Sequence, residues 1–187
     1  MMKQLFIIPI IVFCLSSLNG QRVIGYYPQW VQSSFTPDKI DYSVITHVIH
    51  SFAWPDEQGN ILHYDNMLSQ SVNNTVHDNG AKILLCFGGW GQSWGFSASM
   101  STPELREIFI DNIISVCETY DYDGVDIDWE QPVNATEKDN LTTFIAELRQ
   151  AFDDLYPDWI ISMAVPVSNW SGQYYDFNQL KESVDFF

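Results

Sequence analysis

Short apolar runs alternate with longer amphipathic segments along most of the 187 residues. The strand-like runs are residues 23–27, 43–54, 82–89, 124–130 and 159–167. Strands that alternate with helices imply right-handed crossovers and a mainly parallel sheet, which is either open and doubly wound or closed into a barrel. No internal repeat or interdomain linker interrupts the pattern, so one folded domain is expected.

Two of the intervening segments carry helix signals. Thr102-Pro103 places a capping residue before a proline at the first helical position. A second helix is predicted to begin with Thr136 as its N-cap and to end at Pro157. Its apolar stripe consists of Leu141, Phe144, Ile145, Leu148, Phe152 and Leu155.

The length decides how much of a barrel the chain can supply. Strands begin near residues 22, 44, 82, 123 and 159, and residues 183–187 resemble the start of a sixth strand. At roughly 32 residues per strand-helix unit, eight units need about 260 residues, close to the roughly 250 of a closed eight-stranded barrel. If the sheet is a barrel, we expect an N-terminal portion of it, with exposed edges at the first and last strands.

The first twenty residues predict export. Lys3 precedes an apolar run, residues 5–15, that is too short for a bilayer, which requires about 20 residues. Small or polar residues follow up to Gly20. We therefore expect residues 1–20 to be a signal peptide and the protein to be secreted and extracellular. A buried first helix is the alternative, which Pro9 would break.

The charge balance restricts the partners. The chain has 8 basic and 24 acidic side chains and a formal net charge of -16. Nucleic acids and anionic membrane surfaces would be repelled, so we expect neither as a partner, and a neutral ligand fits better. With 46% hydrophobic and 15% aromatic residues, the chain can bury a core, which argues against a disordered protein.

Two cysteines remain after the expected cleavage, Cys86 in an apolar strand and Cys117 in the next helix. Two buried thiols are expected in preference to a disulfide. Four Asn-x-Ser/Thr triplets permit glycosylation if the host has that machinery, and they begin at Asn73, Asn134, Asn140 and Asn169.

Three acids alternate along one predicted strand. Asp126, Asp128 and Glu130 share one face, because alternate side chains of a strand point the same way. The opposite face carries Val125, Ile127 and Trp129. Same-face neighbours lie about 7 Å apart, so repulsion and partial burial should raise at least one pKa. A carboxyl that keeps its proton near neutral pH can act as a general acid, and Glu130 is the candidate, with Asp128 and Asp126 sharing charge behind it.

Two other interpretations of this segment remain open. The first is a solvated acidic strand, which would leave a whole acidic face in water. The second is a calcium loop, because four residues match positions of the EF-hand pattern, namely Asp121, Asp123, Gly124 and Glu130. Thr119 at the first position and Ile127 at the ninth do not fit that pattern.

The stretch DGVDIDWE, residues 123–130, resembles the Asp-x-x-Asp-x-Asp-x-Glu signature of family 18 glycoside hydrolases, the chitinase family. Asp123, Gly124 and Trp129 support the motif. Further stretches resemble the first, second, third and fifth strands of that family: GYYPQW at 25–30, HSFAW at 50–54, KILLCFGGWGQS at 82–93 and MAVP at 163–166. The resemblance implies an α/β fold, the (β/α)8 TIM barrel, with residues 21–187 as the N-terminal part of its catalytic domain. About five units and the start of strand six would be present.

The resemblance also implies a retaining mechanism in which the substrate assists. Glu130 would protonate the glycosidic oxygen. The carbonyl oxygen of the substrate's own N-acetyl group would attack the anomeric carbon, while Asp128 holds the acetamide N–H and Asp126 lies hydrogen-bonded behind it. Neither a metal nor a cofactor is expected.

By the same resemblance, Tyr26, Phe52, Gly89 and Trp90 would bind the sugar in the cleavage subsite. Flat aromatic rings cover the apolar C–H faces of sugars. Ordinary barrel packing is an equally good interpretation of Tyr26 and Phe52.

Two departures from the family pattern affect the expected activity. Cys86 stands where the family usually has serine. The sixth-strand Met-x-Tyr and the eighth-strand tryptophan of the family lie beyond Phe187, so activity of these residues alone is in doubt.

Several functions share these residues. The first is a chitinase-type hydrolase that binds chitin or N-acetylglucosamine oligosaccharides and cleaves their β-1,4 bonds. The second is an endo-β-N-acetylglucosaminidase that acts on glycans. The third is a chitin-binding, lectin-like protein, in which the terminal Glu is typically replaced; Glu130 favours the enzyme. A truncated product that never folds stably is a further alternative.

Overall fold

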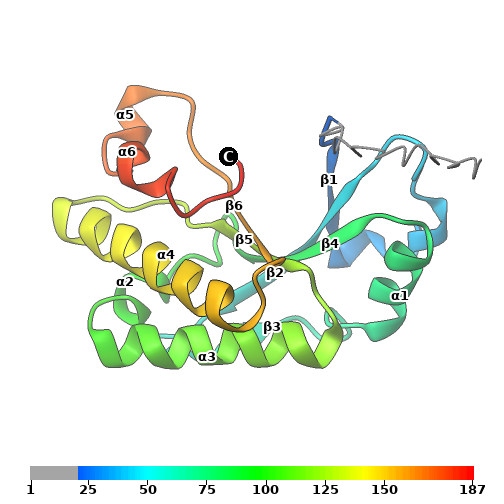
Figure 1. Cartoon of the computed structure of the whole chain (residues 1–187), viewed down its shortest axis with the longest axis horizontal. Coiled ribbons are helices and arrows are strands. Elements are labelled where there is room, and N and C mark those ends of the chain that lie inside the picture. Colours follow the sequence, from blue (N-terminus) through cyan, green and yellow to red (C-terminus); the bar gives the residue numbers. More distant parts are fainter. Residues whose placement is uncertain (1–20) are drawn as a thin grey trace, which may run out of the picture.

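The computed structural model describes residues 21–187, so the expected signal peptide, residues 1–20, lies outside the described residues. Six strands form one sheet (Figure 1). The strands are β1 (Ile24–Pro28), β2 (His47–Pro55), β3 (Ile61–His63), β4 (Lys82–Gly88), β5 (Gly124–Asp128) and β6 (Ile160–Met163). The five predicted strands are confirmed, while the short β3 was not predicted.

The strand order is that of a barrel. β1, β2, β4, β5 and β6 lie side by side in chain order and pair in parallel, and β3 adds to β2 in the antiparallel direction. A doubly wound sheet would reverse its order at a switch point, and this sheet does not. The barrel is not closed, because the structure describes an arc of five parallel strands. Beyond β6, residues 183–187 form only an isolated bridge between Ser162 and Phe186, so the predicted sixth strand is not established.

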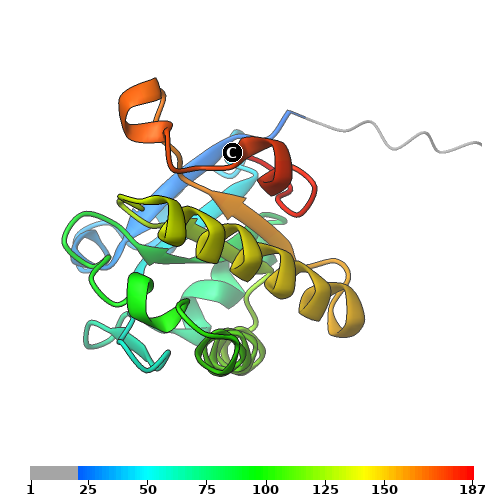
Figure 2. The ribbon, with the colours of Figure 1, turned by 90° about the vertical axis from the view of Figure 1, so that its left-hand side faces the viewer.

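Helices connect the strands. They are α1 (Gln70–Asp78), α2 (Phe96–Ser99), α3 (Pro103–Tyr120), α4 (Ala135–Leu155), α5 (Asn169–Gly172) and α6 (Phe177–Leu180). The long helices α3 and α4 lie next to one another on the same side of the sheet (Figures 1 and 2). None of the helices within residues 21–187 has both the length and the apolarity needed to span a bilayer.

The two predicted helix starts have different outcomes. Thr102 is the N-cap of α3, as expected, and its side chain accepts a hydrogen bond from the Leu105 amide at 3.3 Å. The prediction of Thr136 as the N-cap of α4 was wrong. Asn134 caps that helix by accepting from the Glu137 amide at 2.9 Å, and Glu137 returns a contact to the Val133 amide at 2.7 Å. This reciprocal arrangement satisfies two free amides and selects the earlier start.

The sheet separates two apolar clusters. The larger one packs the outer face of the sheet against the helices and includes Val125, Ile127 and Trp129. The smaller one lies on the inner face and consists of Ile49, Leu84 and Cys86, all fully buried. Cys86 and Cys117 are buried free thiols, as predicted. The inward and outward alternation along β5 therefore follows the sequence pattern.

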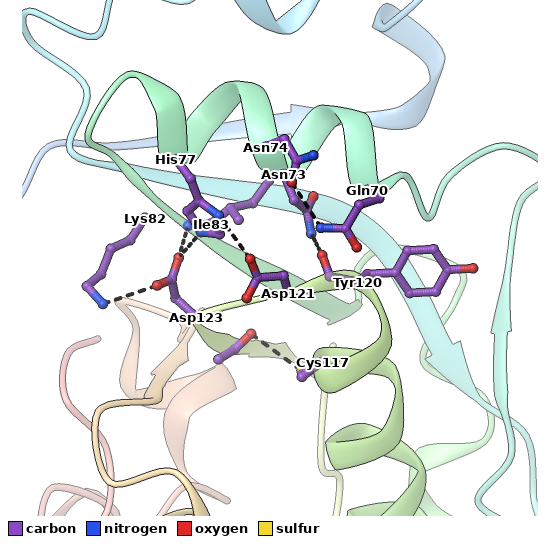
Figure 3. Close-up of polar contacts among 11 residues, drawn as sticks. Gln70, Asn73, Asn74, His77, Lys82, Ile83, Cys117, Tyr120, Asp121 and Asp123 are labelled. Carbon is purple, nitrogen blue, oxygen red and sulfur yellow. Dashed lines mark hydrogen bonds and ion pairs between the residues drawn. The ribbon is translucent and has the colours of Figure 1, made fainter.

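Figure 3 shows how β5 is anchored at its amino end. Asp123 accepts hydrogen bonds from the Ile83 amide at 2.8 Å, from His77 Nε2 at 2.8 Å and from Lys82 Nζ at 3.2 Å. The next residue, Gly124, has φ +133° and passes so close to β6 that a Cβ would lie 2.0 Å from the Ile160 carbonyl oxygen. These first residues of the DGVDIDWE motif therefore fix the strand, and they lie at the end opposite to the last acid.

The calcium-loop interpretation is wrong for the same segment. Residues 124–128 form a parallel strand instead of a loop between two helices, and nitrogen donors occupy both oxygens of Asp123. Within residues 21–187, no three His, Cys, Asp or Glu side chains gather in a way that could hold a metal ion.

Replacing Asp123 tests this anchor. Asp123→Asn is expected to lower the free energy of unfolding by about 1–3 kcal/mol, because charge-assisted hydrogen bonds to a partly buried carboxylate are lost. Asp121→Asn is the matched control: its carboxylate also pairs with His77, at 3.5 Å, but its side chain is 71% exposed, so a change below about 0.5 kcal/mol is expected. Urea denaturation measures both. Equal effects of the two substitutions would contradict the anchoring role.

The Asn-x-Ser/Thr triplets differ in whether their asparagine is accessible for glycosylation. Asn73 is completely buried in α1, and its amide donates to the Tyr120 carbonyl oxygen at 2.7 Å (Figure 3). A glycan has no room at this side chain in the folded protein. Asn134 is exposed at the start of α4, where its side-chain oxygen caps the helix.

Candidate active site

The three alternating acids, Asp126, Asp128 and Glu130, lie at the carboxyl end of β5, but only two of them are in the strand. Asp126 and Asp128 are buried, with 3% and 9% of their surfaces exposed, on the inner face of the sheet. The strand ends at Asp128, so Glu130 follows it by two residues and is exposed. The prediction of one strand over residues 124–130 was therefore too long. The solvated-strand interpretation is wrong, because the first two acids are shielded from water.

Asp126 is held by three donors from three other strands, the adjacent β4 and β6 and the more distant β1. Tyr26 on β1 donates its hydroxyl at 2.8 Å, Cys86 on β4 donates its thiol at 3.2 Å, and Ser162 on β6 donates its hydroxyl at 2.6 Å. Burial and the Asp126 charge raise the pKa of both the Tyr26 phenol and the Cys86 thiol, so both groups keep the protons that they donate.

The alternating acids predict that at least one of their pKa values is raised, and Asp128 has such a raised pKa. Burial, the Asp126 charge and the Glu130 charge, in that order, raise the pKa of Asp128 to about 7. The sequence places the retained proton on the outermost acid, Glu130. Burial is the largest cause of the shift at Asp128. The structure thus shows a raised pKa at Asp128, and the retained proton on Glu130 stays a prediction.

Asp128 and Glu130 open into a cleft of about 390 Å³ at the carboxyl ends of β5 and β6. Two tryptophans also line this cleft, Trp90 beyond β4 and Trp170 in α5, with 88% and 80% of their surfaces exposed. Large exposed rings beside carboxyls are suited to a ligand that has both apolar faces and polar groups.

The predicted sugar-binding residues divide into two groups. Trp90 lines the cleft with the acids. Tyr26 and Phe52 lie on the inner face of the sheet, where Tyr26 binds Asp126 and Phe52 packs against the inner apolar cluster. Gly89 has φ +82°, and a Cβ there would lie 2.7 Å from the Phe52 ring, which explains the need for glycine.

Four further residues of the site were not predicted from the sequence: Ser93, Ser162, Trp170 and Tyr175. Ser162 is the polar inward residue of an otherwise apolar strand, a signal that was available. Ser93 and Tyr175 contact the backbone of the segment that carries Glu130, at 3.0 and 2.7 Å. They lie in loops, where no periodic pattern indicates which residue reaches the site.

Comparison with known proteins identifies the family. A sequence model of glycosyl hydrolases family 18 matches residues 22–187. A chitinase-like effector from Moniliophthora roreri is 32% identical over 164 residues, which are 79% of this chain and 40% of that protein. The chain therefore spans less than half of that relative's length.

Solved structures agree with the barrel interpretation. The group IV chitinase of Ostrinia furnacalis, in complex with allosamidin, has a TM-score of 0.76 at 25% identity, covering 87% of this chain and 48% of that one. The chitinase-like agglutinin of Robinia pseudoacacia has a TM-score of 0.76 at 25% identity, covering 87% of this chain and 52% of that one. The predicted α/β fold, a (β/α)8 TIM barrel of which about five units are present, is confirmed. The chain belongs to glycosyl hydrolases family 18.

Proposed function

We propose that these residues form the N-terminal part of the catalytic domain of a secreted chitinase-type glycosidase. It would hydrolyse β-1,4-linked N-acetylglucosamine polymers with retention of configuration. One observation supports this most strongly: an exposed carboxyl, Glu130, shares a cleft with the buried Asp128, whose pKa is raised to about 7, and with the exposed ring of Trp90.

Each acid has a separate role in the proposed reaction. Glu130 gives a proton to the glycosidic oxygen, which leaves with the departing sugar. The acetamide carbonyl oxygen of the substrate forms a bond to the anomeric carbon as the bond between this carbon and the glycosidic oxygen breaks. The product of this step is an oxazolinium ion. Asp128 stabilises the positive charge that spreads over the acetamide, and Asp126 lies behind Asp128 on the same face of β5. Water then opens the ring, with Glu130 as the base that takes its proton.

The rings would bind the apolar faces of the sugar. Trp90 and Trp170 stand on the cleft wall, and their exposed area is large enough to cover pyranose faces. Tyr26 orients Asp126 through its hydroxyl and has its ring half exposed toward the open barrel. Further strands beside β1 and β6 would close the barrel, so the proposed activity is that of the whole protein.

A chitin-binding protein without hydrolytic activity is the second candidate. It is favoured by the names of two similar proteins, an effector and an agglutinin, that are called chitinase-like. An endo-β-N-acetylglucosaminidase that acts on glycans would use the same acids. Only loops beyond the described residues would distinguish its substrate from that of a chitinase.

One experiment separates these candidates. The protein, in the longest form that its gene encodes, is incubated with a fluorogenic chitotriose, with a high-mannose glycopeptide and with insoluble chitin. Release of the fluorophore supports the chitinase, and cleavage of the glycopeptide alone supports the glycan-specific enzyme. Retention on chitin without cleavage of either substrate supports the binding protein and contradicts the proposed function. Amino-terminal sequencing of the protein from the culture medium tests secretion, with Gln21 as the expected first residue.

A further inference from the structure

The backbone that carries Glu130 lies beyond the end of the sheet. Pairing of β5 with β4 ends at Asp128, and pairing with β6 ends at Ile127. Strand hydrogen bonds therefore do not fix the peptide group between Trp129 and Glu130. A general acid must nevertheless hold its carboxyl group within a fraction of an ångström of the atom that it protonates. Other contacts have to orient this peptide.

Two side chains from separate loops bind the two polar atoms of that one peptide group. Tyr175, between α5 and α6, donates its hydroxyl to the Trp129 carbonyl oxygen at 2.7 Å. Ser93, just before α2, accepts from the Glu130 amide at 3.0 Å. Because a peptide group is planar and has only one donor and one acceptor, these two contacts fix the orientation of its plane.

Both partners are themselves held. Tyr175 is 5% exposed and stacks on Phe177 at 5.8 Å between ring centroids. Burial and the charges of Asp128 and Glu130 raise the pKa of Tyr175, which keeps the phenol protonated as a donor. The Ser93 hydroxyl in turn donates a hydrogen bond to the Gly89 carbonyl oxygen at 3.2 Å.

The side chain of Trp129 completes the support. Its ring stacks on Phe96 at 5.6 Å with an interplanar angle of 16°. The preceding carbonyl oxygen, that of Asp128, accepts from the Gly89 amide at 2.8 Å. The loop that begins at Gly89 and carries Trp90 and Ser93 is thus bonded at two points to the segment that carries the acids.

We propose that Ser93 and Tyr175 are positioning residues that orient the Glu130 carboxyl group by holding the Trp129–Glu130 peptide from both sides. This inference rests on the proposed function of Glu130 as the acid. Rotation of the peptide would swing the Cα–Cβ bond of Glu130 and displace its carboxyl group, and a displacement near 1 Å costs on the order of 100-fold in rate. Substrate binding through Trp90 and Trp170 would be unaffected, so kcat should fall while KM stays constant.

Two single substitutions and their combination test the proposal. Ser93→Ala and Tyr175→Phe are each expected to lower kcat on the fluorogenic chitotriose about 10-fold, and the double variant about 30- to 100-fold, with KM within about twofold. Ser93→Thr keeps the hydroxyl and should restore kcat to within about threefold. Ser97→Ala and Tyr174→Phe are matched controls that remove nearby hydroxyls and leave both bonds of the peptide in place.

A second readout does not depend on activity. Amide hydrogen exchange, followed by NMR at the Glu130 N–H, should accelerate about 10-fold or more in Ser93→Ala and stay unchanged in Ser97→Ala. Unchanged exchange in Ser93→Ala would overturn the proposal, as would a kcat within twofold of the parent in the double variant. If the unsubstituted protein fails to hydrolyse the substrate, the proposed function itself is wrong, and the parent alone reveals this.

Discussion

Glu130→Gln is expected to lower kcat on N-acetylglucosamine oligosaccharides by about 10²- to 10⁴-fold, the usual contribution of a general acid. The amide has the same shape as the carboxyl group but has no acidic proton to give to the leaving oxygen. The contact of the Glu130 amide with Ser93 and that of the Trp129 carbonyl oxygen with Tyr175 do not involve the Glu130 side chain and remain. KM should therefore stay within about threefold of the parent value.

A control and a binding assay complete this test. Glu107→Gln removes an exposed carboxylate on α3, away from the cleft, and should leave kcat unchanged. Retention of Glu130→Gln on insoluble chitin shows that the variant is folded and still binds. If its kcat stays within a few-fold of the parent, Glu130 is not the acid. If neither protein cleaves and both bind chitin, the binding protein is the correct interpretation.

Asp128→Asn is expected to have opposite effects on stability and activity. Because the folded protein raises the pKa of Asp128 to about 7, against about 3.9 in the unfolded chain, it binds this proton more tightly than the unfolded chain does. That contribution to stability is complete below about pH 4 and is lost as the pH rises through about 7. A buried neutral asparagine avoids the loss. The unfolding free energy of the variant minus that of the parent should therefore be about 1–2 kcal/mol higher at pH 8 than at pH 4.

The same substitution should lower kcat about 100-fold or more, because a neutral amide cannot stabilise the positive charge that develops on the acetamide. Urea denaturation at pH 4 and pH 8 measures the stability difference, and initial rates measure kcat. Asp111→Asn, on the exposed side of α3, is the control and should change neither quantity. A stability difference that is the same at both pH values would show that Asp128 does not carry the raised pKa.

The sequence predicts those parts of the fold that repeat. The five parallel strands are each long enough to show an apolar run, whereas the three residues of β3 carry no such signal. The start of α4 depends on whether Asn134 or Thr136 is the N-cap. The hydrogen bond from the Val133 amide to Glu137 favours Asn134. Alternation alone predicts a mainly parallel sheet and the family resemblance selects the barrel, while the boundaries of the elements follow from individual hydrogen bonds.

The residues alone predict the part of the site that follows one strand, and the family resemblance adds Trp90 beyond β4. The alternation of Asp126 and Asp128 is a local property, so their common inward direction was predictable. The end of β5 depends on where β4 and β6 stop pairing with it, so the exposure of Glu130 could not be predicted. Ser162 and Tyr175 reach the motif from 36 and 46 residues away along the chain. Contacts of this kind require the fold.

The anomeric form of the first product tests the proposed chemistry most directly. The substrate's own acetamide attacks from the face opposite the departing sugar, and water then attacks from the face that this sugar occupied, so the two inversions retain configuration and proton NMR within the first turnovers of chitotetraose should show β-anomers before mutarotation. The same tetramer without its N-acetyl groups should not be cleaved. Initial α-anomers, or equal cleavage of the de-N-acetylated tetramer, would contradict the roles assigned to Asp128 and Glu130.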